Sequence, residues 1–320
     1  MKNRIIAKII KSGPLRLDRF FKAWTKHYYA NCNPFGVNGD FITAPEISQL
    51  FGESIALWLI AATEQLASFN LVEIGAGRGI LLNDILRLIT QDKTTSSKLQ
   101  ASIIVENSPS LIKEQKKTLQ NHQVCWVKNC ELLPSGNNMI IANEFFDAIE
   151  PRQFTNKDGV ILETYVNYAD NKFEFSYIPI KSPLAINGIY ETSPAARKLC
   201  TTINKKLGNG QALIIDYGYF ENPGISTLQC LANNKITPLF DKPFVADITY
   251  LVNFLELANC FIGRQVNLMT QKEFLIANKV DLLALKLIKS GADPENIIRD
   301  MTRLVSPEQM GELFKVMVVS

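Results

Sequence analysis

Three glycines at alternate positions, preceded by an acid, are the residues whose spacing most directly indicates chemistry in this sequence. The run Leu71–Leu82 reads as a short apolar segment with Glu73, then Gly75, Gly77 and Gly79, then an amphipathic segment. This pattern is typical of a strand, a tight turn and a helix start. Glycine allows positive φ and lets a ligand approach the backbone closely. The turn would present backbone N–H groups beside a helix N-terminus, where a nucleotide-like cofactor fits.

The spacing of these glycines argues against a dinucleotide. The dinucleotide fingerprint G-x-G-x-x-G needs a third glycine at position 80, which is Ile80 here. Glu73 would repel a pyrophosphate, but it suits the positive ammonium and sulfonium groups of S-adenosylmethionine. A second acid, Glu106, ends the next apolar run, where it can accept hydrogen bonds from ribose hydroxyls. Taken alone, the glycines also fit an ordinary turn of any α/β protein.

A second group of polar residues, Asn143, Glu144 and Asp147, follows the apolar run 138–142. Ligands of open parallel sheets bind at the carboxyl ends of strands where the strand order reverses. We therefore expect this turn and the glycine turn to line one crevice. The two carboxylates can hold a cation, and Asn143 can accept from a reacting N–H group. The alternative for Asp147 is a helix cap.

Methyl transfer from a sulfonium depends mainly on alignment and desolvation. If the acceptor is an arginine, its guanidinium begins charged, with a pKa above ~12, and carboxylates orient it through paired hydrogen bonds. The candidates for this role are Glu144, Asp147 and Glu46. Asp216 ends another apolar run, and it either lines the pocket or serves as a turn residue.

The composition is that of a globular chain without a strong overall charge. The 320 residues are 47% hydrophobic and 20% charged, which supports one large domain or a domain with an insertion. The net charge of +3 gives no indication of nucleic-acid or membrane binding, and no apolar run reaches the ~18 residues of a membrane span. Six scattered cysteines favour a reduced cytosolic setting, and with two histidines no metal site is predicted.

Strands and helices alternate from Phe69 onward. Strands are predicted near 70–74, 102–106, 124–127, 138–142 and 211–216, and helices near 80–90, 109–120, 194–207 and 247–258, with a loop at 91–100. This alternation implies right-handed crossovers and a mostly parallel sheet. The predicted fold class is therefore α/β.

Additional segments precede and interrupt this pattern. Helices are predicted at Ile5–Lys11 and Leu17–Lys26, and the runs Val160–Tyr168 and Lys172–Ile180 predict an inserted hairpin. Late strands are expected at 264–269 and 314–319, with helices near 271–277, 280–290 and 294–303 between them. Met1–Lys11 lacks the serines of a transit peptide and a signal-type cleavage site. The predicted domains are an N-terminal helical region with a lid loop, 1–66, and a second domain, 67–320, with insertions at about 155–193 and 270–310.

The stretch Gly39–Ser48 allows two interpretations. Thr43 and Glu46 have the spacing of a capping box, with Pro45 tolerated in the first turn of a helix that runs to about Leu66. On one interpretation this is only a well-made helix start. On the other, the loop before the helix reaches over the cofactor, which places Thr43 among the predicted cofactor-binding residues.

Several motifs, in order along nearly the whole chain, resemble the MidA-type methyltransferases. These are bacterial relatives of the mitochondrial complex I assembly-factor protein arginine methyltransferase. The motifs are Gly39–Ser48 with Phe51–Glu53, Glu73–Gly79, Asn143–Ala148, Ser193–Ala196, Ile215–Gly218, Ala246–Thr249, Thr270–Phe274 and Met310–Val316. Gly39–Ser48 is highly specific, whereas the glycine turn alone is not.

The resemblance implies a class I, Rossmann-like methyltransferase fold that uses S-adenosylmethionine. It implies symmetric dimethylation of an arginine in a respiratory complex I subunit, in the bacterial cytoplasm or a mitochondrial matrix, and a role for Gly39–Ser48 as a pocket lid. The cofactor-binding residues are then Thr43, Glu73, Gly75, Ala76, Gly77, Gly79, Glu106 and Asn143. Two departures are Ala76, where many members carry proline, and Leu251 and Asn253, where members often carry histidine and aspartate.

Other functions remain open at this point. The acceptor is alternatively a small molecule, or the chain is an assembly factor that binds a client without catalysis. A nicotinamide-dependent oxidoreductase is disfavoured by Ile80 and Glu73.

Overall fold

A computed structural model of the chain describes residues 1–31, 43–181, 186–232 and 235–320. Its contacts divide the chain into two compact units. We call Ile42–Phe145, Leu199–Tyr217 and Ala258–Ser320 the core unit, and Met1–Phe41, Phe146–Lys198 and Gly218–Leu257 the accessory unit. The predicted boundary between residues 66 and 67 lies inside the core unit. The two units therefore do not coincide with the predicted domains, 1–66 and 67–320, which stay a prediction.

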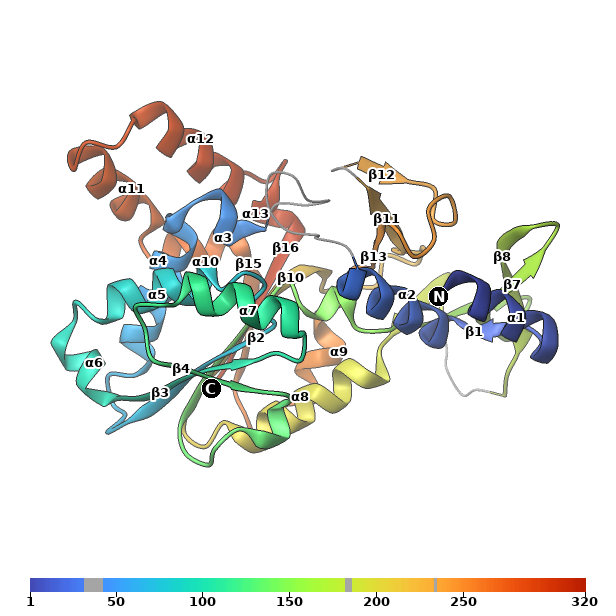
Figure 1. Cartoon of the computed structure of the whole chain (residues 1–320), viewed down its shortest axis with the longest axis horizontal. Helices are drawn as coiled ribbons and strands as arrows, with labels where there is room; N and C mark the ends of the chain where they lie inside the picture. Colours follow the sequence, from blue (N-terminus) through green and yellow to red (C-terminus); the bar gives the residue numbers. More distant parts are fainter. Residues whose placement is uncertain (32–42, 182–185, 233–234) are drawn as a thin grey trace. The chain divides into compact units, whose positions relative to one another are not determined.

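The core unit is built on a mostly parallel sheet (Figure 1), which confirms the predicted α/β fold class. Its strands are β2 (Phe69–Ile74), β3 (Leu99–Val105), β4 (Val124–Val127), β5 (Asn138–Asn143), β10 (Ala212–Tyr219), β15 (Val266–Thr270) and β16 (Phe314–Val319). Their order is β15-β16-β10-β5-β2-β3-β4. The pairs from β10 to β4 are parallel, and β16 runs antiparallel to both of its neighbours. The strands predicted in this region, early and late, are all present.

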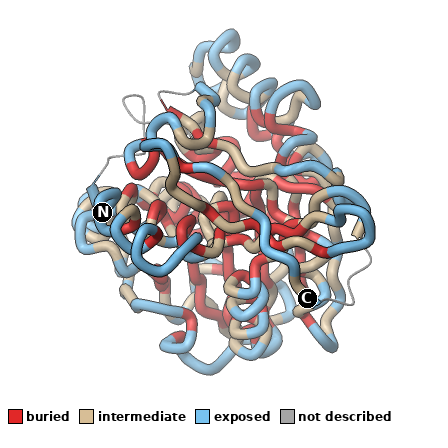
Figure 2. The backbone as a smooth tube through the Cα atoms, turned by 90° about the vertical axis from the view of Figure 1, so that its right-hand side faces the viewer, coloured by how far each residue is buried: buried red, intermediate tan, exposed pale blue. Residues whose placement is uncertain are grey.

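Both faces of this sheet are buried, as expected for strands that read as continuous apolar runs. All six residues of β2 and of β5 are buried. One face, with Leu71, Ile141 and Ile215, shares a single core cluster with buried side chains of α4 and α5. The tube in Figure 2 is accordingly red along the interior strands and pale blue along outer loops.

The helices of the core unit are α3 (Ala44–Ile47), α4 (Gln49–Ala62), α5 (Ile80–Ile89), α6 (Lys93–Lys98), α7 (Pro109–Thr118), α10 (Gln271–Ala277), α11 (Val280–Lys289), α12 (Pro294–Val305) and α13 (Met310–Leu313); α8 (Pro194–Lys206) continues into it, and η1 (Cys130–Leu132) is a 3₁₀ turn. The helices predicted near 80–90, 109–120, 194–207 and late in the chain are confirmed. The predicted loop at 91–100 was wrong, because Asp92 caps α6 by accepting from the backbone N–H of Thr95 at 3.0 Å.

The helix predicted from residue 44 to about 66 is interrupted at Ser48. Its backbone is extended, with φ −157° and ψ 141°, so α3 ends before it and α4 begins after it. The side chain of Ser48 accepts from the backbone N–H of Leu50 and caps α4.

The accessory unit combines two helices with small antiparallel sheets. It contains α1 (Lys2–Ser12), β1 (Leu15–Arg16), α2 (Leu17–Asn31), η2 (Phe146–Ala148), β6 (Arg152–Lys157), β7 (Val160–Ala169), β8 (Lys172–Pro179), β9 (Ile189–Thr192), β11 (Gln229–Ala232), β12 (Lys235–Thr237), β13 (Asp247–Thr249), β14 (Val252–Asn253) and α9 (Phe254–Ala258). One sheet has the order β1-β7-β6-β9 with β8 on β7, and the other has the order β12-β11-β13. The predicted hairpin is β7–β8, and its turn residues Asp170 and Asn171 both have positive φ.

Two further predictions concern the accessory unit. The predicted helix at 247–258 was wrong, since β13, β14 and the short α9 occupy this stretch. The predicted helix Leu17–Lys26 is confirmed as part of α2, where Phe20, Phe21 and Trp24 are fully buried and the indole N–H of Trp24 donates to the carbonyl of Ala246 at 2.7 Å.

Among the residues described, no helix combines the length and the apolar character needed to cross a bilayer.

Candidate functional site at the carboxyl ends of β2, β3 and β5

The pairing of β2 with β3 on one side and β5 on the other brings the predicted site together. Strand order reverses at β2, so the carboxyl ends of these strands frame a switch-point crevice. Glu73 lies level with Ile104 of β3 and Ile141 of β5. Glu106 and Asn143 come two residues later on those strands. Because side chains alternate along a strand, Glu73, Glu106 and Asn143 belong to the same face of the sheet.

The glycine turn has the backbone that its sequence predicts. Gly75, Gly77 and Gly79 have φ of 68°, 48° and 83°, and Gly79 is the N-cap of α5. A Cβ at Gly75 would lie 2.3 Å from the ring of Phe145, so this glycine allows the β5 turn to pack against it. Ala76 is buried, and its carbonyl accepts from the N–H of Gly79 at 2.6 Å.

Glu73 is a buried acid with one unsatisfied oxygen. Its side chain is 3% exposed and accepts a hydrogen bond from the backbone N–H of Leu82 in the first turn of α5. Burial raises the pKa of Glu73 to about 8. Its Oε2 has no hydrogen-bond partner among the described residues. A buried acceptor without a partner is costly, and a cationic group in the crevice would satisfy it.

Asn143 offers a second buried acceptor on the same face. Its side-chain N–H donates to Oε1 of Glu144 at 3.2 Å, which fixes the orientation of the amide. Its Oδ1 then has no partner in the part of the chain that the structure describes. The sheet register therefore places two unsatisfied acceptors, Glu73 Oε2 and Asn143 Oδ1, at the ends of adjacent strands.

Glu144 holds a conformation that favours glycine. Its φ is 49°, and its backbone N–H donates to the carbonyl of Ile215 at 2.9 Å. Its half-buried carboxylate accepts from the backbone N–H of Ala44 at 2.9 Å. Glu144 thus connects the β5 turn to the start of α3, one hundred residues earlier in the chain.

The short helix α3 is held at two points of the site. The predicted capping box is wrong, because the side chain of Thr43 makes no capping hydrogen bond and Glu144 accepts from the first helical N–H instead. At its other end, Glu46 forms an ion pair with Arg78 of the glycine turn, with N and O 3.4 Å apart. Ala44 and Glu46 therefore contact the two turns of the site, the pocket-lid role of Gly39–Ser48 stays a prediction, and Gly39–Ile42 lie outside the described residues.

Glu106 is half-buried, and its contacts leave part of its carboxylate available. Its Oε1 accepts from the backbone N–H groups of Asn107 and Ser108, each at 2.8 Å. Its Oε2 receives a longer bond of 3.4 Å from Gln115. A carboxylate offers about four acceptor positions, so a ribose hydroxyl can still be bound.

The sequence did not predict that Gln115 of α7 belongs to the site. Its fully buried side chain donates to the carbonyl of Gly77 at 2.9 Å and accepts from the indole N–H of Trp126 at 2.9 Å. It thereby links the glycine turn to Glu106 and fixes both. The available signal was an amide on the inward side of an otherwise amphipathic helix.

Two further acids that the sequence offered for the site are Asp216 and Asp147. Asp216 is fully buried inside β10, so it is not a turn residue, and it accepts from the backbone N–H groups of Phe145 at 3.0 Å and Tyr217 at 2.9 Å. Asp147 belongs to the accessory unit, where η2 packs against β13. It is 7% exposed, and burial raises its pKa to about 7. Its catalytic role stays a prediction.

Comparison with known proteins places this chain in a family. Residues 54–270 match the model of a family described as "Putative S-adenosyl-L-methionine-dependent methyltransferase". The protein named "Protein arginine methyltransferase NDUFAF7, mitochondrial" is 29% identical in Danio rerio, over 97% of this chain and 84% of that protein. The Homo sapiens protein of that name is 27% identical, over 98% of this chain and 82% of its own.

Solved structures show the same fold. A Burkholderia thailandensis protein of the COG1565 superfamily, bound to S-adenosyl-homocysteine, has a TM-score of 0.88 at 24% identity, covering 99% of this chain and 91% of its own. A native structure from the same organism has a TM-score of 0.85. The predicted class I, Rossmann-like methyltransferase fold is thereby confirmed.

Proposed function

Since the chain belongs to the family of S-adenosyl-L-methionine-dependent methyltransferases, we propose that it methylates an arginine side chain of a protein substrate. Methyltransferase activity and the use of S-adenosylmethionine follow from the family, which confirms the predicted cofactor. The arginine acceptor is supported by the carboxylates beside the cofactor turn and by the names of the similar eukaryotic proteins. Symmetric dimethylation of a complex I subunit is the finer part of this proposal, and it follows from the MidA resemblance.

The residues proposed to hold the cofactor are those around the glycine turn. Glu73 Oε2 and Asn143 Oδ1 are the acceptors suited to its cationic groups, and Glu106 is the acceptor suited to its ribose. When bound, S-adenosylmethionine supplies an electrophilic methyl group on a positively charged sulfur. Phe145, which packs against Gly75, excludes water from this end of the crevice.

The residues proposed to receive the arginine are Glu144 and Glu46. Glu144 accepts from the backbone N–H of Ala44 at the start of α3, and Glu46, which belongs to α3, pairs with Arg78 of the glycine turn. A pair of carboxylates can orient a guanidinium through charge-assisted hydrogen bonds and stabilise its charge. The nitrogen loses its proton once the methyl group is attached, and a carboxylate within hydrogen-bonding reach can take that proton. Asp147 is the third proposed acid.

The observation that carries this proposal is the position of the Glu144 carboxylate, directly after β5 and beside the turn that follows β2. A small-molecule acceptor has no comparable need for two acids. We propose that the protein acts in the cytoplasm if its source is a bacterium, and in the mitochondrial matrix if its source is an organism with mitochondria.

The proposal is tested by methylation of proteins with labelled S-adenosylmethionine. The purified chain is incubated with extract from cells that lack the gene, and arginine methylation is mapped by mass spectrometry. The expected result is symmetric dimethylarginine in one or few proteins, absent with Glu144→Gln. Label found only in small molecules would refute the protein acceptor, and a variant that restores biological activity without methylation would favour a non-catalytic assembly factor.

A further inference from the structure

The first two helices carry a large excess of positive charge. Residues 1–31 hold eight of the chain's 34 Lys and Arg side chains but only one, Asp18, of its 31 Asp and Glu side chains. The whole chain has a net charge of only +3, so the remainder is acidic on balance. The small overall charge thus conceals one strongly basic segment.

Few of these cations are neutralised within the protein. Arg16 pairs with Asp18 at 2.7 Å, and Lys22 pairs with Glu150 at 2.6 Å. The others are exposed and have no ion-pair partner in the described ranges: Lys2, Arg4, Lys8, Lys11, Arg19 and Lys26. These six together with Lys22 are called the basic surface below. Unpaired, solvated cations of this density attract an anionic partner.

The opposite faces of both helices are already occupied. Ile5 and Ile9 of α1, and Phe20 and Trp24 of α2, are buried in one hydrophobic cluster of the accessory unit. Neither helix can therefore turn its main apolar face toward a partner. What each helix offers is the outer face, and the tube beside the N label in Figure 2 is mostly pale blue.

The cations have the spacing of helix stripes. In α1, Arg4, Lys8 and Lys11 follow the i, i+4, i+7 spacing, which places them on one face. The cations of α2 follow a similar spacing, at residues 19, 22 and 26. Beside the α1 stripe, Ile10 is 71% exposed, so an apolar side chain lies in water among lysines.

We propose that the basic surface of α1 and α2 docks the protein on an anionic lipid bilayer. Five of its seven cations are lysines, which act as point charges and lack the fork by which arginine recognises single carboxylates. Groups of 4–8 Lys and Arg on an amphipathic helix are typical of contacts with acidic lipids. Ile10 supplies a short apolar anchor for the interface. None of the seven cations of this surface is among the residues proposed for the methyltransferase site.

Vesicle flotation with the full-length protein tests the proposal. The protein is expected to float with vesicles of phosphatidylcholine and phosphatidylglycerol, not with phosphatidylcholine alone, and to be released by salt. Lys8→Glu with Lys11→Glu is expected to lower the partition coefficient by at least about 25-fold, at roughly fivefold for each lysine. Ile10→Ser is expected to lower it without any change in charge.

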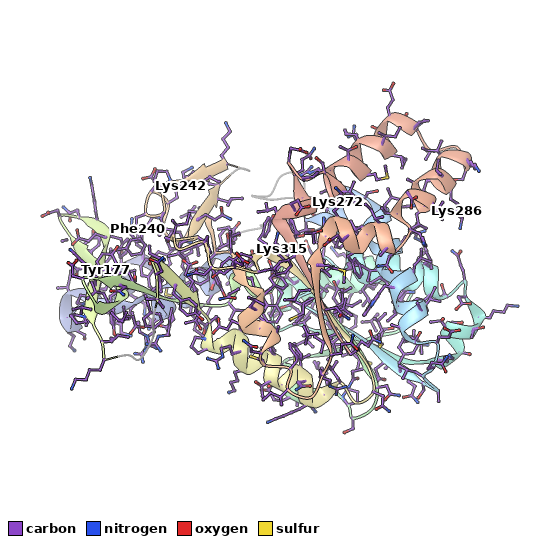
Figure 3. The ribbon with its side chains drawn as sticks, turned by 180° about the vertical axis from the view of Figure 1, so that it is seen from behind. Tyr177, Phe240, Lys242, Lys272, Lys286 and Lys315 are labelled. Atoms are coloured by element: carbon purple, nitrogen blue, oxygen red, sulfur yellow. The ribbon has the colours of Figure 1, made fainter. Side chains whose placement is uncertain are left out.

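The matched control is Lys286→Glu with Lys289→Glu on α11, where Lys286 is labelled in Figure 3. These two lysines have the same spacing, are also exposed and likewise have no ion pair among the residues described. The control is expected to keep vesicle binding. Equal loss in both double variants, or loss only in the control, would overturn the proposal.

Competition with a soluble polyanion distinguishes binding to lipid from binding to an acidic protein. Polyglutamate is expected to compete poorly with vesicles of equal total charge. Efficient competition together with an unchanged Ile10→Ser variant would assign the basic surface to an acidic protein and overturn the lipid proposal. S-adenosylmethionine binding, measured by calorimetry, is expected to be unchanged in every variant. Unchanged binding of S-adenosylmethionine verifies that each variant is folded. It also means that loss of vesicle binding is distinguishable from failure of the proposed methyltransferase function.

Discussion

The carboxylate of Glu144 accepts a hydrogen bond from the backbone N–H of Ala44 at 2.9 Å, although the two residues are one hundred positions apart. This contact gives α3 the cap that Thr43 does not supply. It also holds Glu144 at a backbone φ of 49°, which costs a residue with a Cβ about 1–2 kcal/mol.

Glu144→Gln is expected to abolish most methyl transfer while cofactor binding persists. The amide oxygen can still accept from Ala44, but the negative charge facing the acceptor guanidinium is lost. We expect kcat to fall by at least about a hundredfold, the magnitude typical of removing one aligned electrostatic group. Labelled-methyl kinetics and calorimetry separate the two effects. Glu131→Gln, an exposed acid of the same unit, serves as the control. Full activity in Glu144→Gln would contradict the assigned role.

Gly75→Ala is expected to impair cofactor binding strongly. Its Cβ would lie 2.3 Å from Phe145 at a φ of 68°, so either the turn or the ring must move. We expect S-adenosylmethionine affinity to fall at least about tenfold, which corresponds to ~1.4 kcal/mol. Gly13→Ala is matched in φ, at 82°, but meets no atom within 4 Å. Because its ψ is −176°, Gly13→Ala should lose roughly 1–3 kcal/mol of stability, but its cofactor affinity should be unchanged. Calorimetry that found equal cofactor affinity in both variants would refute this geometry.

Arg78→Gln is expected to affect the acceptor more than the fold. Arg78 is 46% exposed, so solvent screens its pair with Glu46 and the free energy of unfolding should change by less than about 1 kcal/mol. Release of Glu46 should raise KM for the protein acceptor by up to about fivefold.

The control for this prediction is Arg87→Gln, which breaks the pair with buried Glu53 at 2.8 Å. We expect it to lower the melting temperature and to leave KM unchanged. A KM shift of equal size in the two variants would mean that Arg78 has no special part in positioning Glu46.

Glu73 is expected to make stability fall as pH rises. Its folded pKa, about 8, lies above the 4.5 of an exposed glutamate, so the folded state binds the proton more tightly than the unfolded state. The free energy of unfolding should therefore decrease between about pH 4.5 and 8 and level off above that range. Asp84 and Asp147, whose pKa values burial also raises, contribute with the same sign.

Thermal melts of the native chain and of Glu73→Gln over a series of pH values measure the contribution of Glu73. That contribution is the difference between the free energies of unfolding of the two proteins at each pH. The amide keeps the acceptor for Leu82 but cannot ionise, so the variant should show a shallower decline. A cationic cofactor favours the ionised form, so S-adenosylmethionine affinity of the native chain should rise with pH toward 8. Parallel stability curves for the two proteins would be inconsistent with a protonated Glu73.

Local patterns were sufficient for the sheet and the glycine turn. The strand with Leu71 and Ile74 is a short apolar run followed by glycines, and a run of this length bounded by a glycine turn is typical of a buried strand. The expectation that the turns after 70–74 and 138–142 line one crevice supposed that these strands are neighbours, and they do pair. The wrong interpretation of 247–258 has a nonlocal cause, since Asp247–Thr249 pairs with Gln229–Leu231 and tertiary pairing overrides the local apolar spacing.

The site was predictable to the extent that its residues follow strands directly. Glu73, Glu106 and Asn143 could be placed because each ends an apolar run. The cap of α3 could not be predicted, because Glu144 reaches Ala44 from a distant segment. Gln115 was missed for the same reason, since its partner Gly77 is 38 residues away.

The division into two units has a consequence for dissecting this protein. The polypeptide passes between the core and accessory units five times, and β10 contributes residues to both. No fragment cut at a single position therefore contains one unit whole without pieces of the other. The roles of the two units have to be separated by point substitutions, because a truncation long enough to remove the whole of one unit also removes part of the other.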